Sequence, residues 1–298
     1  MNAGRVARAE AAYLGLALGD ALGATVEFLT PREIRCRYGV HREIRGGGWL
    51  RLRAGQVTDD TTMSLALGAA ILADGGAVRP LSCAQAFDGW MRAKPIDIGN
   101  TVRRNLITFR RSGDPCAPPS EHDAGNGAAM RVLPVALATL DADATAVAAA
   151  VRAQAHVTHH NAVSDAACDF LVLAVQDFVR GEPLRHVYRR RLLPLLAAYP
   201  QFAYKGRRRE NPSGWIVETM QAVLQALLET DNFESCLVDV TNRGGDADTT
   251  GAIAGMLAGA LYGLDAIPPR WLRGLDAAAR EACRTQAWQL AQASPSAA

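Results

Sequence analysis

The chain has 298 residues, of which 49% are hydrophobic and 21% are charged. This mixture is typical of globular proteins with a sizeable buried core, and it excludes a chain that is disordered throughout. The formal net charge is only +2, so the overall field gives no indication of a nucleic-acid partner.

Helical periodicity dominates the sequence, and convincing runs of alternating β-branched residues are absent. No low-complexity tract separates two halves of the chain. We therefore expect an all-α fold, a single compact multi-helix domain covering residues 1–298 with its core at about 7–292. In chain order, the predicted helices cover residues 7–22, 59–74, 80–93, 98–111, 126–140, 144–156, 161–180, 184–198, 213–229, 233–241, 248–262 and 268–292.

Three long loops connect these helices, at residues 30–57, 112–125 and 200–212. Loops of this length within a compact helical body usually carry functional sites. The third loop contains the basic cluster Arg207–Arg209, which is either a solvated surface or a contact for phosphate or an acidic partner.

The six cysteines are scattered, without a Cys-x-x-Cys pair. No secretory signal precedes them, and the longest apolar stretches, 11–18 and 251–264, are too short to span a bilayer. We expect reduced thiols in a cytoplasmic protein that has no transmembrane anchor.

The start of the predicted helix at 59–74 is the first candidate for a functional site. Thr58 can cap this helix, and Asp59 and Asp60 follow in its first turn. Carboxylates at this position can simply compensate the positive end of the helix dipole. Taken alone, this helix start favours a structural role.

The helix at 248–262 begins with the same chemistry, Gly244-Gly245-Asp246-Ala247-Asp248-Thr249. The glycines allow a sharp turn, so that Asp246 and Asp248 can direct both carboxylates to one point. Carboxylate and threonine oxygens are the ligands that Mg²⁺ and Mn²⁺ prefer, whereas no His or Cys is interleaved at a spacing suited to zinc. Together, the two helix starts predict a site for divalent metal ions.

A glycine-rich loop, Asp123-Ala124-Gly125-Asn126-Gly127, precedes the predicted helix at 126–140. Such a loop can present backbone N–H groups to a pyrophosphate, although glycine at a helix entry is often only a steric requirement. No Gly-Lys-Ser or Gly-Lys-Thr ending follows it, so nucleotide hydrolysis is not indicated.

Four blocks of this sequence resemble the ADP-ribosylglycohydrolase family, in the order that the family has them. They are Gly19-Asp20-Ala21-Leu22-Gly23 with Glu27-Phe28, Thr58-Asp59-Asp60-Thr61, residues 125–131 and residues 245–250. The stretches 46–52, 97–101, 164–168 and 204–206 are similar to the branch of the family that acts on dinitrogenase reductase. Thr62 departs from that branch, which commonly has an acidic residue there.

The resemblance, which spans residues from about 10 to 290, implies a domain that holds two divalent ions, Mn²⁺ or Mg²⁺, at the bottom of a cleft. In the family these metals bind the hydroxyls of the distal ribose. Carried over to the matching positions, the implied metal ligands are Thr58, Asp59, Asp60, Asp246, Asp248 and Thr249.

Cleavage of a glycosidic bond requires a proton for the leaving group and an activated water. The resemblance implies that Glu27, beside the metals, and Asp97, near the arginine, are the catalytic carboxylates. It leaves open which residue is the acid. Without the resemblance, Glu27 would be interpreted as a surface carboxylate and Asp97 as a helix N-cap.

The resemblance also implies contacts with the substrate. His159 is one of them, although a lone histidine at a helix entry is more often a cap or surface residue. The other implied contacts, to the diphosphate and ribose, are Asn100, Thr101, Gly125, Asn126, Gly127, Met130 and Tyr204.

The implied activity is hydrolysis of the N-glycosidic bond of ADP-ribosyl-arginine on a protein, with dinitrogenase reductase as that protein. The resemblance further implies a PII signalling protein as a partner and, through it, reversible association with a membrane ammonium channel; we expect a monomer. The alternatives are a hydrolase of other ADP-ribose linkages, or a non-catalytic ADP-ribose-binding or structural protein. The latter is disfavoured because all the implied ligands and both carboxylates are present.

Overall fold

The computed structural model describes residues 3–204 and 206–293; the ends of the predicted domain, 1–2 and 294–298, lie outside this part. Within the described residues the elements are helices, with two isolated β-bridges and no strand, which confirms the all-α fold. The elements are α1 (Ala3–Gly23), α2 (Pro31–Tyr38), α3 (Asp59–Ala73), α4 (Pro80–Arg92), α5 (Asn100–Ser112), α6 (Leu133–Ala138), α7 (Ala144–Ala155), α8 (Ala162–Val179), α9 (Leu184–Val187), the π-helix η1 (Tyr188–Leu192), α10 (Leu193–Ala198), the 3₁₀-helix η2 (Pro200–Phe202), α11 (Ile216–Glu229), α12 (Phe233–Thr241), α13 (Ala247–Tyr262), the 3₁₀-helix η3 (Leu264–Ala266), α14 (Pro269–Gly274) and α15 (Ala277–Ala293).

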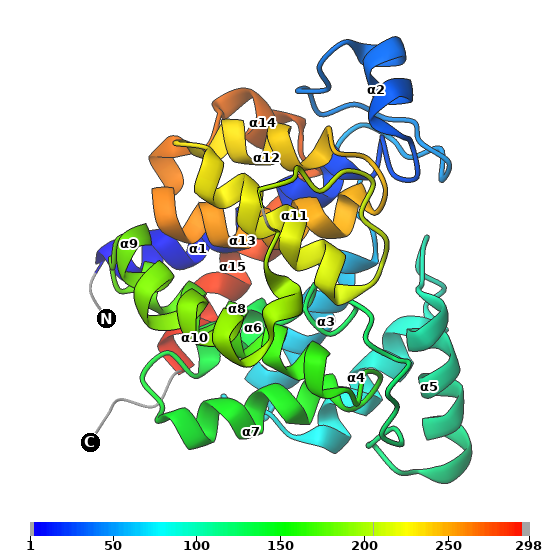
Figure 1. Cartoon of the computed structure of the whole chain (residues 1–298). Coiled ribbons are helices and arrows are strands. Elements are labelled where there is room, and N and C mark those ends of the chain that lie inside the picture. Colours follow the sequence, from blue (N-terminus) through cyan, green and yellow to red (C-terminus); the bar gives the residue numbers. More distant parts are fainter. Residues whose placement is uncertain (1–2, 205, 294–298) are drawn as a thin grey trace.

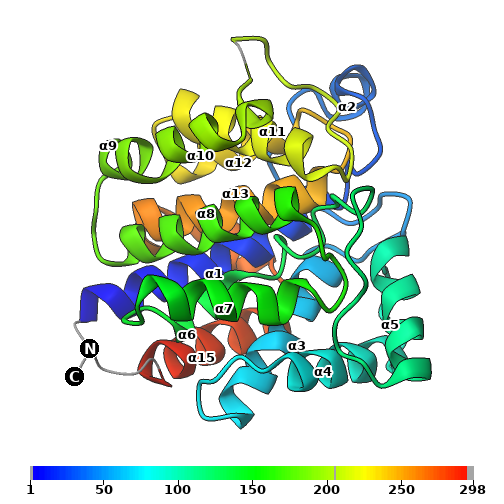
Figure 2. The ribbon, with the colours of Figure 1, turned by 60° about the horizontal axis from the view of Figure 1, so that its bottom comes forward.

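Helices α1 and α13 lie side by side in the middle of the molecule (Figure 2), with α8, α12 and α15 packed around them. Both central helices are apolar over most of their surface, as expected of helices that are buried on all sides. A Cβ atom on Gly15 would lie 2.1 Å from the Gly255 carbonyl oxygen, and one on Gly19 would lie 1.9 Å from that of Gly251. The two backbones are therefore in direct contact, which only glycine allows at these positions.

One hydrophobic cluster extends through the helices from Ala9 in α1 to Ala291 in α15. Among its aromatic members, Tyr13, Phe87 and Trp271 are each fully buried. Outer helices contribute only one face to this cluster; α5, for example, buries Val102, Asn105 and Leu106. The smaller helix α2 lies at the edge of the molecule (Figure 1).

Helix α2 falls inside the segment 30–57 that was expected to be a loop. It begins with a capping box, in which the Thr30 hydroxyl accepts from the Glu33 N–H and the Glu33 carboxylate accepts from the Thr30 N–H. Pro31 occupies the first helical position. The helix buries only Ile34, so its sequence lacks the long apolar periodicity on which the prediction relied.

Two other predicted helices have different bounds in the structure. The helix predicted at 126–140 forms only over α6, because residues 126–132 make turns around the glycine-rich loop. The helix predicted at 268–292 divides into α14 and α15. Asp276 stands at this break, and its carboxylate accepts from the N–H groups of Ala278 and Ala279 to begin α15.

All six cysteines are free thiols, as the sequence predicts. None of the helices in the described residues combines the length and the apolar character that a membrane span requires.

Candidate active site

A cavity of about 470 Å³ opens where the starts of α3, α5 and α13 meet the glycine-rich loop. No lysine or arginine is found among the described residues that line it. The predicted site residues that line the cavity are Glu27, Asp59, Asp97, Asn100, Thr101, Gly125, Asn126, Gly127, Met130, His159, Asp246, Asp248 and Thr249.

The remaining three predicted site residues do not line this cavity. Thr58 and Asp60 are buried next to it, and the Asp60 carboxylate accepts from the hydroxyls of Thr58 at 3.3 Å and Thr249 at 3.4 Å. The second contact joins the two acidic helix starts, which are far apart in sequence. Tyr204 instead lines a separate cavity beside Arg207–Arg209, so the structure does not bring it to the other predicted residues.

Asp20, near the end of α1, fixes the start of α3. Its carboxylate accepts from the N–H and the hydroxyl of Thr58, each at 3.0 Å, and from those of Thr61 at 3.2 and 2.5 Å. Thr58 occupies the N-cap position, as predicted, but its side chain bonds Asp20 rather than the helix backbone. Burial raises the pKa of Asp20 to about 6, while these hydrogen bonds oppose the shift.

The turn Gly244–Gly245 fixes the start of α13 against the segment that carries Glu27. The Phe28 N–H donates to the Gly245 carbonyl at 2.7 Å, and the Gly245 N–H donates to the Leu29 carbonyl at 3.0 Å. Both glycines have positive φ angles, and a Cβ on Gly244 would lie 2.1 Å from the Leu29 carbonyl oxygen. This close pairing holds Glu27 and Asp246 next to each other.

Glu27, Asp246 and Asp248 form the tightest carboxylate group, since ligand atoms from all three lie within 4.8 Å of one another. Burial, with the charges of neighbouring carboxylates, raises the pKa of Glu27 to about 8 and that of Asp59 to about 7. Burial also raises the pKa values of Asp60, Asp246 and Asp248. Because no lysine or arginine is among the described residues that line the cavity, the repulsion between these carboxylates is largely uncompensated there.

The donor atoms of this cluster fit divalent cations. Asp60 Oδ1 is buried without a hydrogen-bond partner, although a buried carboxylate oxygen is costly to leave unpaired. Asp59, Asp246 and Asp248 line the adjoining cavity with further hard oxygen ligands, and the Thr249 hydroxyl lies 3.4 Å from the other Asp60 oxygen. Cations bound here would supply the positive charge that the protein itself does not provide.

Trp49 is a cavity residue that sequence reasoning missed. Its indole N–H donates to Glu27 Oε2 at 2.6 Å, and its ring centroid lies 5.6 Å from that of Phe28. Phe28 also lines the cavity and has a positive φ of 60°. The available signal was its place in the family-like stretch 46–52 within a long loop, since long loops in compact domains often carry functional residues.

Asp97 lies at the cavity and does not cap α5. Its carboxylate accepts from the adjacent Ile98 N–H at 2.7 Å, whereas the N-cap of α5 is Gly99. The side chain is only partly buried. Asp97 therefore reaches the cavity from a more exposed position than Glu27.

His159 is held against the glycine-rich loop by a chain of buried hydrogen bonds. Arg131 donates to the Thr158 hydroxyl at 2.8 Å, and this hydroxyl lies 2.8 Å from His159 Nδ1. Burial and the charge of Arg131 lower the pKa of His159 to about 3, so the ring is neutral. If the Thr158 hydroxyl, which accepts from Arg131, donates its own proton to Nδ1, the single ring proton is on Nε2.

The glycine-rich loop is shaped by contact with this histidine. A Cβ on Gly125 would lie 3.0 Å from His159 Nε2, and one on Gly127 would lie 2.7 Å from its Cε1. Between them, the Asn126 amide donates to Asp246 at 2.5 Å and to the Thr219 hydroxyl at 3.0 Å. The loop thus connects the acidic cluster to the histidine side of the cavity.

Comparison with known proteins identifies the family. A family model described as ADP-ribosylglycohydrolase matches residues 1–297. The chain is 48% identical over 279 residues to the ADP-ribosyl-(dinitrogen reductase) glycohydrolase of Rhodospirillum rubrum, with 94% of each chain covered. It is 34% identical to an ADP-ribosylarginine hydrolase of Pseudomonas putida (strain GB-1), covering 89% of this chain and 73% of that one.

A solved structure described as an ADP-ribosylglycohydrolase-related protein complex matches with a TM-score of 0.86 and 35% identity, over 98% of this chain and 99% of that chain. Fold, family model and relatives agree along nearly the whole sequence. The chain belongs to the ADP-ribosylglycohydrolase family and is a hydrolytic enzyme.

Proposed function

We propose that the chain hydrolyses the N-glycosidic bond between ADP-ribose and an arginine side chain of a protein, releasing ADP-ribose and restoring the arginine. The observation that carries this proposal is the buried carboxylate cluster of Glu27, Asp59, Asp246 and Asp248 in one cavity with the glycine-rich loop. The cavity volume is within the range of about 300–1,000 Å³ that is usual for small-molecule sites.

Dinitrogenase reductase is the protein substrate that we propose. The support is the name and the 48% identity of the Rhodospirillum rubrum relative. On the same resemblance we propose that the chain binds a PII signalling protein and, through it, a membrane ammonium channel. We further propose that the chain is a monomer in the cytoplasm. Co-purification with a PII protein tests this part, and its failure would leave the hydrolase activity unaffected.

The proposed ligands of two divalent cations, Mn²⁺ or Mg²⁺, are Thr58, Asp59, Asp60, Asp246, Asp248 and Thr249. Bound cations would act as Lewis acids that orient the ribose hydroxyls and screen the carboxylates. The unpaired, buried Asp60 Oδ1 supports this assignment.

Glu27 and Asp97 are the proposed catalytic carboxylates. Trp49 fixes Oε2 of Glu27, which leaves Oε1 to position and activate a water. Asp97 is more exposed, which suits exchange of a proton with the large arginine leaving group. Guanidine is strongly basic, so its departure requires that proton.

The ADP-ribose is proposed to bind against His159 and the glycine-rich loop, which line the same cavity as the carboxylates. His159 offers an N–H at Nε2 to a phosphate or ribose oxygen, and Gly125, Asn126 and Gly127 offer a loop without bulky side chains. Asn100, Thr101 and Met130 complete the proposed contacts. Tyr204, from its separate cavity, remains a proposal that rests on resemblance.

The direct test is hydrolysis of ADP-ribosyl-arginine by the purified chain with Mn²⁺, measured as released ADP-ribose. We expect turnover that stops when the metal is chelated and returns when Mn²⁺ is restored. ADP-ribosyl-serine serves as the matched substrate and should be cleaved far more slowly. No release from the arginine conjugate, or preference for the serine conjugate, would contradict the proposal.

A further inference from the structure

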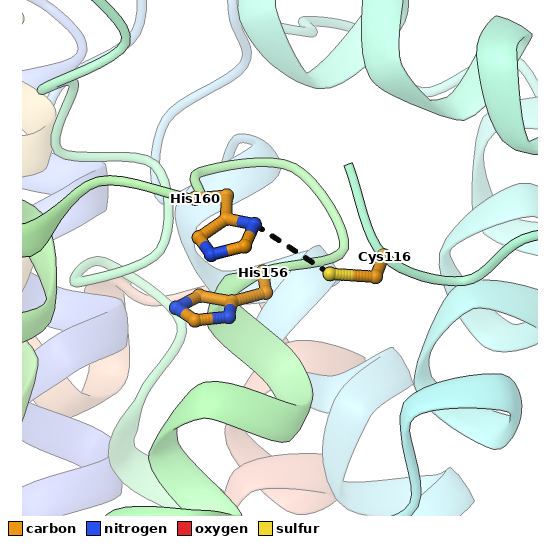
Figure 3. Close-up of side chains that lie close together, drawn as sticks. All are labelled: Cys116, His156 and His160. Carbon is orange, nitrogen blue, oxygen red and sulfur yellow. Dashed lines mark hydrogen bonds between the residues drawn. The ribbon is translucent and has the colours of Figure 1, made fainter. Parts of the chain in front are cut away.

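A second group of metal-ligating side chains lies outside the cavity described above. Cys116, from the loop after α5, lies beside His156 and His160, which flank the end of α7 and the approach to α8 (Figure 3). One ligand atom from each residue lies within 4.8 Å of the others. Neither the hydrolase reaction nor the acidic cluster uses any of these three side chains.

The backbone holds the two chain segments of this group together. The Ala117 N–H donates to the His156 carbonyl at 2.8 Å, and the Ser120 N–H donates to the His160 carbonyl at 3.0 Å. The segment that carries Cys116 is therefore tied at two points to the segment that carries both histidines. The close approach of these two backbone segments is therefore built into the fold.

The distance between Cys116 and His160 suits two ligands of one ion. Cys116 Sγ lies 3.6 Å from His160 Nδ1. Two ligands at zinc distances of about 2.3 Å for sulfur and about 2.05 Å for nitrogen are separated by about 3.6 Å when the angle between them is tetrahedral.

His156 has the partner that metal-binding histidines usually have. Its Nε2 lies 2.9 Å from one carboxylate oxygen of Asp165 and 3.1 Å from the other. Asp165 also pairs with Arg152 at 3.3 Å, which holds this carboxylate in place. Donation from Nε2–H to Asp165 leaves His156 Nδ1 as a free ligand, the arrangement found around protein-bound zinc.

We propose that Cys116, His156 and His160 bind a borderline-soft divalent ion such as Zn²⁺, with water in the fourth position. The thiol and imidazole set favours such an ion over the Mg²⁺ or Mn²⁺ proposed for the carboxylate cluster. Binding displaces the Cys116 thiol proton to solvent, because the thiolate is the ligand.

Two local adjustments accompany binding. The imidazole rings of His156 and His160 are stacked, with centroids 3.8 Å apart and planes 18° from parallel, so the rings must turn toward a common point. His160 Nδ1, which lies 2.8 Å from the Ala117 carbonyl oxygen, exchanges this contact for the ion. Because all three side chains are exposed or only partly buried, these rotations disturb no core packing.

Cobalt titration of the full-length, metal-stripped protein tests this site without reference to hydrolysis. Co²⁺ bound by a thiolate gives a sulfur-to-metal charge-transfer band in the near ultraviolet, whereas Co²⁺ in the all-oxygen cluster does not. We expect one equivalent of this band, lost in Cys116→Ser and reversed by added Zn²⁺. Cys36→Ser is the matched control, because Cys36 is also exposed but is no member of a metal-ligating group in the described residues.

The histidine variants and Asp165 extend the test. His156→Gln and His160→Gln should each weaken Zn²⁺ binding by at least about tenfold, and Asp165→Asn by about 10–100-fold, the usual effect of losing a partner of a ligating histidine. Circular dichroism of each variant controls for folding. Absence of the band at saturating Co²⁺, or a band that persists in Cys116→Ser, would overturn the proposal.

Discussion

The contact between α1 and α13 is built differently at its two ends. Along Gly15 and Gly19, the two helices meet directly through backbone atoms. Directly after Gly19, α1 presents Asp20, and the start of α13 presents Asp248; both are buried carboxylates with raised pKa values. The glycine end stabilises the fold through close packing, whereas burying several carboxylates together at the other end costs free energy unless positive charge compensates them.

Closely packed helices can hold several buried carboxylates in place despite their mutual repulsion. Buried carboxylates repel one another and would separate if their supports could move. The glycine contacts leave α1 and α13 no room to slide, and the Asp20 hydrogen bonds fix α3 to the same frame. The glycine contact of α1 and α13 therefore holds the carboxylates near Asp20 and Asp248 in a fixed arrangement. Functional sites are positioned most accurately when rigid elements support them in this way.

The largest expected effect is at the charged end. Asp246→Ala or Asp60→Ala should lower hydrolysis by roughly 10³-fold, the scale of losing a main electrostatic contact. Because each change removes a buried like charge, metal-free thermal stability should be unchanged or higher. Circular dichroism and ADP-ribose release measure both effects, and full activity in either variant would remove the metal assignment.

The second largest expected effect is a loss of stability when a glycine in the α1–α13 contact is replaced. Gly19→Ala would place a Cβ 1.9 Å from the Gly251 carbonyl oxygen, so the helices must separate. We expect a loss of about 3 kcal/mol or more, or roughly 10 °C in Tm. Gly89→Ala in α4 is the matched control, because its Cβ would meet nothing within 4 Å; it should be neutral or slightly stabilising. Equal melting temperatures for the two variants would contradict the claim that the α1–α13 contact requires glycine at this position.

A third prediction measures how the frame orients His159. Thr158→Val removes the hydroxyl between Arg131 and His159 Nδ1, and should lower kcat/KM about tenfold, the scale of one buried hydrogen bond. Thr158→Ser retains the hydroxyl and should retain activity. Imidazole ¹⁵N chemical shifts report the tautomer independently; an unchanged Nε2–H tautomer in the valine variant would contradict this role.

The smallest expected effect is the dependence of thermal stability on pH. The pKa values of about 6 for Asp20, 7 for Asp59 and 8 for Glu27 lie above those of the unfolded chain. The folded protein then binds more protons than the unfolded one, so raising pH through this window favours unfolding. In EDTA, we expect the Tm to fall by on the order of 5 °C between about pH 5 and pH 8.

Saturating Mn²⁺ should remove most of this slope, because the bound charge favours the ionised carboxylates. Thermal melts at matched pH values, with EDTA or Mn²⁺, give the comparison directly. A Tm that rises with pH in EDTA would show that the cluster does not destabilise the metal-free fold.

The sequence predicted the parts of the site that are local. Each acidic helix start carries its carboxylates within a few residues, so spacing and the family resemblance could predict both as parts of one site. Contacts between residues far apart in the chain could not be predicted from the sequence. The hydrogen bond from Trp49 to Glu27 and the approach of Cys116 to His160 both depend on how distant segments pack together. Tyr204 shows the converse, since resemblance assigned it to the site and the fold puts it in another cavity.

The sequence also predicted some helix bounds better than others. Long apolar helices such as α1, α8 and α13 lie close to where periodicity predicted them. The short, polar α2 depends on a capping box that periodicity does not detect, and the break at Asp276 depends on a cap within an otherwise helical pattern. Local hydrogen bonds decided both of these segments.

The most direct test of the account is an anomalous-scattering map from crystals soaked in Mn²⁺. We predict two manganese peaks among the carboxylates of Asp59, Asp60, Asp246 and Asp248, within the cavity that Glu27 and Asp97 line. No peak in this cavity at saturating Mn²⁺, or peaks bound only elsewhere, would contradict the claim that the rigid α1–α13 frame holds a cation site.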